Sequence, residues 1–137
     1  MRRAILPFLI PALFVAVPGA TTGAAQTPDW SQARPLTIEL SSFKFTPASE
    51  ALQRGTPYRL HLVNTSSGGH DFVAKEFFAG SIVAPEDRAK ITNGGVDVGG
   101  GESVDVRLIP NRTGHFKVHC SHFLHSSFGM TGAITVQ

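Results

Sequence analysis

The sequence predicts an all-β domain, an antiparallel sandwich or barrel with one short helical segment. Two observations lead to this fold class. Short runs in which apolar and polar residues alternate recur along the chain, and this period of two is that of half-buried strands. Clusters of Gly, Pro, Asn and Ser separate the runs at short intervals. Short strands joined by frequent turns are typical of β-sandwiches and β-barrels.

The first predicted strand begins at Leu36, where Leu36, Ile38 and Leu40 would share one face. Five further alternating runs follow, at residues 58–63, 71–74, 103–108, 115–120 and 132–136. Turn-forming residues lie between them, at 54–57, 64–69, 93–95, 99–101 and 110–114. Residues 85–90 break the alternation, with Pro and acids early and bases late, as in a short helix. Residues 26–35 are a polar lead-in without an assigned structure.

The N-terminus predicts a cleaved secretory signal. Two arginines precede an apolar run, Ala4–Val17, and small residues follow at Gly19–Ala25. The apolar run is shorter than the roughly 20 residues that a membrane-spanning helix needs. We expect cleavage after Ala25, export to the periplasm or the exterior, and no membrane anchor afterwards. The exported chain would contain the lead-in and one domain at residues 36–137.

Charge and cysteine content narrow the range of functions that the chain can have. The full chain has 12 Lys and Arg against 10 Asp and Glu. Loss of Arg2 and Arg3 with the signal would leave ten of each, without a basic patch for nucleic acid. The single cysteine, Cys120, cannot form an internal disulfide. An unpaired thiol in an oxidising compartment is then buried and inert, a metal ligand or a nucleophile. We expect a monomer.

The segment from His119 to Met130 contains the candidate chemistry. It offers a thiolate from Cys120, several imidazoles including that of His125, and a thioether from Met130. Imidazole and soft sulfur ligands together select copper, and two His, one Cys and a weak axial Met are the ligands of electron-transfer copper. Cys120 would end one strand and Met130 would precede the next, so both ends of the loop would be fixed.

The second imidazole comes from elsewhere in the chain, and His61, His70 and His115 are the candidates. The leucines in residues 58–63 take the inward face of that strand, which turns His61 outward. His115 lies on the opposite face of its strand from Cys120. His70 follows a Gly-Gly turn at the start of a strand, where a side chain can sit at the end of a sandwich. His70 is the preferred ligand, and His61 remains the alternative.

The pattern of His70 followed by Cys120-x4-His125-x4-Met130, just before a last strand, resembles the cupredoxins, the plastocyanin and azurin family of type 1 copper proteins. The resemblance covers residues 36–137. It implies a Greek-key antiparallel β-sandwich of seven or eight strands with one copper per chain. It also implies that the protein is an electron carrier rather than an enzyme, passing single electrons between redox partners by Cu(I)/Cu(II) cycling.

In the family, the more C-terminal histidine lies among apolar residues at the surface, so the resemblance implies that redox partners dock near His125. The residues that would form this docking patch are Phe77, Phe78, Phe123, Leu124 and Phe128. The phenylalanines of this set are as compatible with core packing as with docking.

One residue departs from the family pattern, because Asp71 follows the first histidine where the family commonly has Asn. An ionised carboxylate near copper would stabilise Cu(II) and lower the reduction potential. The same carboxylate would also serve as a brace that accepts hydrogen bonds from the ligand loop, for example from Ser121. The sequence does not choose between these two roles.

Two further histidines, His119 and His122, leave other functions open. Histidines flanking the cysteine also resemble the last motif of multicopper oxidases, but Ser121 replaces one of their imidazoles and the chain has no His-x-His pair. A single-chain oxidase is therefore disfavoured, whereas a copper site shared between subunits through His119 stays open. The main alternative to electron transfer is a periplasmic copper-binding or copper-tolerance protein with copper as cargo, in which His119 and His122 add secondary copper sites.

Overall fold

The computed structural model describes residues 19, 23–122 and 130–137. The predicted signal lies outside these residues except for Gly19 and residues 23–25, so cleavage and export stay predictions. Four of the predicted site residues also lie outside them: Phe123, Leu124, His125 and Phe128. Within the described part of the chain, no helix is both long and apolar enough to cross a membrane.

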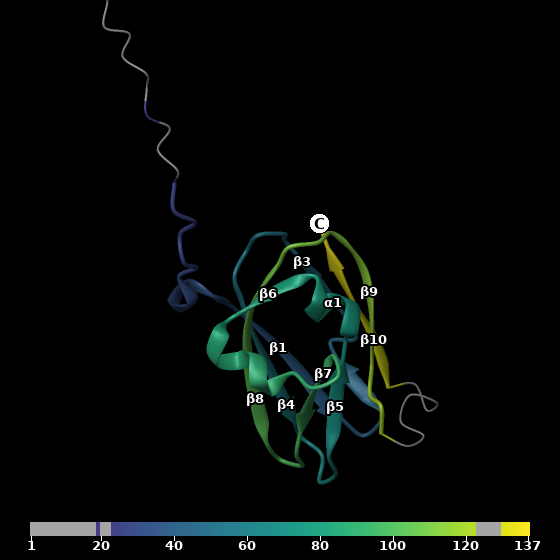
Figure 1. Cartoon of the computed structure of the whole chain (residues 1–137). Helices are drawn as coiled ribbons and strands as arrows, with labels where there is room; N and C mark the ends of the chain where they lie inside the picture. The colour runs from purple at the N-terminus through teal and green to yellow at the C-terminus, as the bar shows by residue number, and fades with distance from the viewer. Residues whose placement is uncertain (1–18, 20–22, 123–129) are drawn as a thin grey trace, which may run out of the picture.

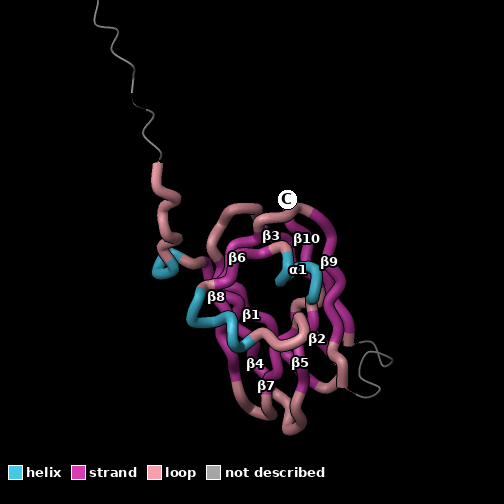
Figure 2. The backbone as a smooth tube through the Cα atoms, viewed as in Figure 1, coloured by secondary structure: helices cyan, strands magenta, loops and turns pink. Residues whose placement is uncertain are grey.

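Ten strands form two five-stranded sheets over residues 23–122 and 130–137. Figures 1 and 2 show how the strands wrap around a common interior. The first sheet contains, in spatial order, β2 (Lys44–Thr46), β1 (Arg34–Ser41), β4 (Tyr58–Asn64), β8 (Ser103–Pro110) and β6 (Ser81–Val83). The second contains β3 (Ser49–Leu52), β10 (Thr131–Val136), β9 (Gly114–His119), β5 (His70–Val73) and β7 (Gly95–Val98). The predicted β-sandwich is confirmed.

The strand directions and the strand number differ in detail from the prediction. Among the described pairs, β1 with β4 and β3 with β10 are parallel, whereas the prediction was wholly antiparallel. After β1 the chain turns back into β2, crosses to the other sheet for β3 and returns, so it enters β4 in the same direction as β1. The strands without a predicted counterpart are β2, β3, β6 and β7, each of only three or four residues.

Three short helical segments accompany the sandwich in the described residues: the 3-10 helices η1 (Trp30–Gln32) and η2 (Pro85–Lys90), and the α-helix α1 (Lys75–Ala79). The predicted helical segment at 85–90 is confirmed as η2. In the lead-in, the Asp29 carboxylate caps η1 by accepting a hydrogen bond from the Ser31 amide at 3.0 Å. Strand β1 then begins at Arg34, two residues before the predicted start.

The core lies between the two sheets, and the predicted alternation explains which side chains fill it. In β4, Leu60 and Leu62 are buried, whereas His61 points outward. In β9, Phe116 and Val118 are buried, whereas His115, Lys117 and His119 are exposed. Both faces were predicted from the sequence, and both predictions are confirmed.

Helix α1 contributes two aromatic rings to this core. Phe77 and Phe78 are only 2% and 6% exposed. Their rings pack edge to face against Phe116 and Phe72, with centroid separations of 5.9 and 6.2 Å. The suggestion that Phe77 and Phe78 form a docking patch is therefore wrong, because neither ring is available at the surface. Their alternative role in core packing is the correct one.

Candidate metal centre

The turn before β5 positions His70, and a buried asparagine organises that turn. Asn64 is 1% exposed. Its amide nitrogen donates to the carbonyl oxygens of Gly68 at 2.8 Å and Val98 at 3.0 Å. Its amide oxygen accepts hydrogen bonds from the Ser66 backbone at 3.0 Å and hydroxyl at 2.7 Å. The Asn64 side chain thus closes the turn through Ser66 and Gly68 and joins it to β7 through Val98. The chain therefore enters β5 in a fixed position.

A glycine-rich loop between β7 and β8 packs against the same turn. The Gly101 amide donates to the Ser66 carbonyl oxygen at 3.0 Å. At Gly100 a Cβ atom would lie 2.1 Å from the carbonyl oxygen of Ser67, far inside van der Waals contact. Glycine is therefore required at this position by the close approach of the two backbones. The contact gives the turn before His70 a second support.

Cys120 and Met130 lie at the adjoining ends of β9 and β10. The ladder between these strands reaches His119 opposite Thr131. One residue further out, the Cys120 amide donates to the Met130 carbonyl oxygen at 3.1 Å. Both Cys120 and Met130 are 0% exposed. The strand ends therefore hold the two sulfur-bearing residues together, as the sequence predicted.

The cysteine thiol also lies close to the first histidine. The distance from Cys120 Sγ to His70 Nδ1 is 3.8 Å, and His70 is only 4% exposed. Burial raises the pKa of the Cys120 thiol, although backbone N–H groups of Asp71 and His122 oppose part of this effect. The thiol consequently keeps its proton at neutral pH unless a cation replaces it. A buried thiol beside a buried imidazole is thus suited to a soft metal ion.

Asp71 connects the strand of His70 to the residue after Cys120. It is 6% exposed, and its carboxylate accepts hydrogen bonds from the Ser121 amide at 2.6 Å and from the Ser121 hydroxyl. This is the contact named above as the brace. The carboxylate is therefore placed to fix the beginning of the ligand loop against β5.

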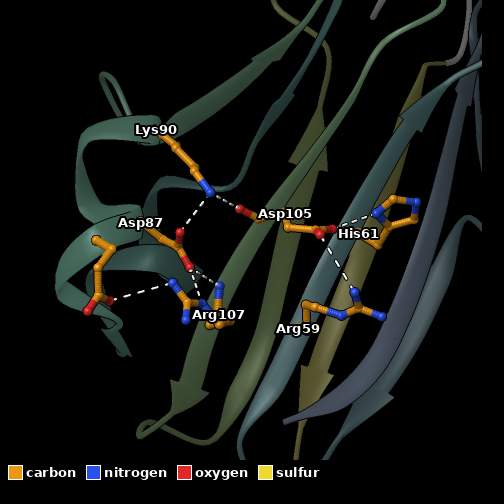
Figure 3. A network of polar contacts seen from close by, with 7 residues as sticks. Arg59, His61, Asp87, Lys90, Asp105 and Arg107 are labelled. Atoms are coloured by element: carbon orange, nitrogen blue, oxygen red, sulfur yellow. Dashed lines mark hydrogen bonds and ion pairs between the residues drawn. The ribbon is translucent and has the colours of Figure 1, made fainter. Parts of the chain in front are cut away.

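The other candidate histidines for the first ligand position lie elsewhere. His61 is on the outward face of β4, where its Nδ1 is 2.5 Å from Asp105 Oδ1 (Figure 3). His115 is exposed on β9, with its Nδ1 3.0 Å from the Thr135 hydroxyl. Both residues lie on outward faces of their strands, whereas His70 is buried with its Nδ1 beside Cys120 Sγ, so the geometry favours His70.

The histidines flanking Cys120 differ in their surroundings. His119 is exposed at the end of β9. His122 is half-buried, and its ring centroid lies 6.3 Å from that of His70. It also lies near Asp71 and Asp97, since one ligand atom from each of these three residues is within 4.8 Å of the others. Asp97 was not identified from the sequence, because β7, which positions it, was not predicted.

Comparisons with known proteins identify the family and the fold of the chain. A family model described as copper binding proteins of the plastocyanin/azurin family matches residues 33–137. No curated protein sequence is significantly similar to the chain.

Similar solved structures share the fold at low sequence identity. One is a dithionite-reduced auracyanin from Roseiflexus castenholzii, with 16% identity, a TM-score of 0.57, and coverage of 77% of this chain and 98% of that one. Auracyanin B has 22% identity, a TM-score of 0.56, and coverage of 83% and 93%. A multi-copper oxidase from Pseudomonas thermotolerans has 21% identity and a TM-score of 0.62, with coverage of 82% of this chain but only 31% of the oxidase.

Proposed function

Because the chain belongs to the plastocyanin/azurin family of copper-binding proteins, we propose that it carries single electrons between redox partners through one type 1 copper. The observation that carries this proposal is the buried pair of His70 and Cys120, with 3.8 Å between Nδ1 and Sγ. Met130 is joined to Cys120 by a backbone hydrogen bond and is equally buried. Imidazole, thiolate and thioether are the donors that select copper over harder ions.

The chain's own residues would bind the ion and exclude water from it. His70, Cys120, His125 and Met130 are the proposed ligands, and bound copper supplies a one-electron couple. Asn64 fixes the turn before His70, and the ladder between β9 and β10 fixes Cys120 beside Met130. Ligands held in this way need little movement when the charge of the ion changes, which favours fast electron transfer.

Export and partner docking belong to the same proposal. A signal at residues 1–25 would deliver the protein to the periplasm or the exterior. As a monomer it would then meet its redox partners around His125, without bond-making catalysis of its own. With Phe77 and Phe78 in the core, the remaining candidates for an apolar docking patch are Phe123, Leu124 and Phe128.

Copper as cargo is the second candidate function. The exposed His119 and the half-buried His122 flank Cys120 in the sequence and offer two further imidazoles that could bind copper near the surface. The two functions differ in retention, because a carrier keeps one reversibly redox-active ion whereas a cargo protein releases it readily. The shared-site alternative through His119 requires an oligomer, so purification as a strict monomer with one copper would remove it.

Titration of the metal-free protein with Cu(II) tests the electron-carrier proposal. We expect an intense visible thiolate-to-copper absorption band that saturates at one copper per chain, with a matching electron paramagnetic resonance signal. Cys120→Ser should abolish the band, because serine provides no thiolate. The matched control is His61→Gln, which removes an imidazole from the other sheet and should leave the band unchanged. A colourless complex, or the same spectrum in Cys120→Ser, would rule out a type 1 site.

A further inference from the structure

We propose that Asp71, Asp97 and His122 form a second metal site, for a divalent ion of intermediate softness such as Zn²⁺ or Cu²⁺. The ligand atoms of these residues already lie within 4.8 Å of one another. Tetrahedral ligands with bonds of about 2.0–2.1 Å stand roughly 3.3 Å apart. Asp97 is exposed and His122 only half-buried, so modest side-chain rotations would bring the three donors to this spacing.

The first argument for a cation here is the pairing of two acids across the sheet. Asp71 and Asp97 are directly opposite each other in the ladder between β5 and β7. Like charges in opposite positions of an antiparallel pair destabilise a sheet. Over residues 23–122 and 130–137, none of the salt bridges joins either carboxylate to a lysine or an arginine. A cation between the two carboxylates would turn this repulsion into attraction.

The second argument is the chemistry and accessibility of the donors. Two carboxylate oxygens alone would suit Mg²⁺ or Ca²⁺, but an imidazole shifts the preference towards Zn²⁺ and Cu²⁺. Asp71 and Asp97 line a surface recess, and its other lining residues include Asn93, His119, Ser121 and one lysine, Lys75, which forms no salt bridge with either carboxylate within the described residues. An ion can therefore reach the carboxylates from solvent, and polar groups surround its path.

The proposed ion would act on the copper centre through Asp71. The same carboxylate accepts the hydrogen bond from the Ser121 amide, and Ser121 directly follows Cys120. A divalent cation on Asp71 would add positive charge near the type 1 site and disfavour Cu(II) relative to Cu(I). Occupancy would thus raise the reduction potential, and this coupling rests on the proposed function.

Calorimetric titration of the copper-loaded protein with Zn²⁺ tests the site. We expect one Zn²⁺ per chain in addition to the copper, with the thiolate-to-copper band intact. Asp97→Asn and His122→Gln should each weaken Zn²⁺ binding by at least about tenfold, because even loss of a residue that only orients a metal ligand costs about 10- to 100-fold in affinity. The matched control is Asp105→Asn, which removes the carboxylate of another Asp and His pair, on the other sheet, and should bind Zn²⁺ like the wild type.

Other outcomes separate the two proposals. Zinc binding that is absent, that bleaches the copper band, or that is equal in Asp97→Asn would overturn the second site and leave the type 1 assignment untouched. If the copper band never forms, the electron-carrier proposal fails, and the comparison of wild type with Asp97→Asn still decides the second site. The coupling is checked by voltammetry, where Zn²⁺ should raise the midpoint potential of the wild type but not that of Asp97→Asn.

Discussion

At the scale of single residues, Asp71 combines two effects that one substitution can separate. Its carboxylate braces Ser121 by accepting hydrogen bonds from the amide and the hydroxyl. It also places a negative charge one residue from His70. In Asp71→Asn the amide oxygen still accepts from the Ser121 N–H, and the amide nitrogen can donate to the hydroxyl oxygen. The brace is then kept while the charge is removed.

We therefore expect Asp71→Asn to raise the midpoint potential of the copper and to leave the visible spectrum nearly unchanged. A unit charge roughly 7 Å away at an effective dielectric constant of about 20 contributes about 2 kcal/mol, or roughly 100 mV. Protein-film voltammetry in buffer freed of other metal ions measures the shift. Asp105→Asn, on the other sheet, is the charge-matched control. A potential that stays the same would mean that the Asp71 carboxylate is screened from the copper.

Sequence reasoning proposed candidate site residues that are close together along the chain. The sequence shows a regular spacing of Cys120, His125 and Met130, and it places Asp71 next to His70. These residues could therefore be proposed as metal ligands or their neighbours without a structure. Asn64 and Asp97 were missed, because their roles depend on contacts with distant strands. Asn64 acts through Val98, and Asp97 through its register with Asp71.

At the scale of elements, the position of His70 depends on two loops that touch. The turn between β4 and β5 carries Ser67, and the loop between β7 and β8 carries Gly100 at a separation too small for a side chain. Gly68, in the same turn, has open space around the position of a Cβ atom. Alanine substitutions at Gly100 and at Gly68 therefore provide a matched test of how closely the two loops must approach.

Gly100→Ala should lower the free energy of unfolding by about 1–3 kcal/mol, because the new methyl group forces the two backbones apart. Gly68→Ala should stay within about 0.5 kcal/mol of the wild type. Urea denaturation of the metal-free proteins measures both values. Equal stability of the two variants would show that the loops separate without strain. Displacement of the turn should also weaken copper binding in Gly100→Ala, through His70.

The length of each strand and helix explains which of them the sequence could predict. The strands β1, β4, β8, β9 and β10 have six to eight residues, enough for several alternations of apolar and polar side chains. Strands of three residues such as β2 and β6 contain too few alternations to recognise. Helix α1 has only five residues, too few for a helical repeat of apolar residues around Phe77 and Phe78 to be recognised in the sequence.

At the scale of the whole molecule, one connecting segment ties the two sheets together. After β5 in the second sheet the chain forms α1, joins the first sheet as β6, forms η2 and returns to the second sheet as β7. Asp87 in η2 anchors this segment to β8 (Figure 3). Its carboxylate, 3% exposed, lies 2.7 Å from Arg107 Nε and 2.7 Å from Lys90 Nζ. It also accepts a hydrogen bond from the Arg107 amide at 2.9 Å.

These contacts make the stability of the sandwich depend on pH in the acid range. Burial alone would raise the pKa of Asp87, but the hydrogen bonds from Arg107 and Lys90 outweigh it and hold the pKa well below its usual value. A carboxyl group with a lowered pKa in the folded state stabilises the fold fully above its unfolded pKa of about 4. That contribution decreases as the pH falls below about 4 towards the folded-state pKa.

Asp87→Asn should therefore lower the free energy of unfolding by about 2 kcal/mol at pH 7, because Arg107 and Lys90 lose their ionised partner. Below about pH 4 the difference from the wild type should shrink, since protonation removes the same charge from Asp87. Glu86→Gln is the control: Glu86 pairs with the same Arg107 at 3.5 Å, but its side chain is 68% exposed, so its loss should change stability by at most about 0.5 kcal/mol. Urea denaturation between pH 2.5 and 7 provides the comparison. A gap between wild type and Asp87→Asn that stays constant with pH would mean that η2 is anchored by the shape of the side chain and not by its charge.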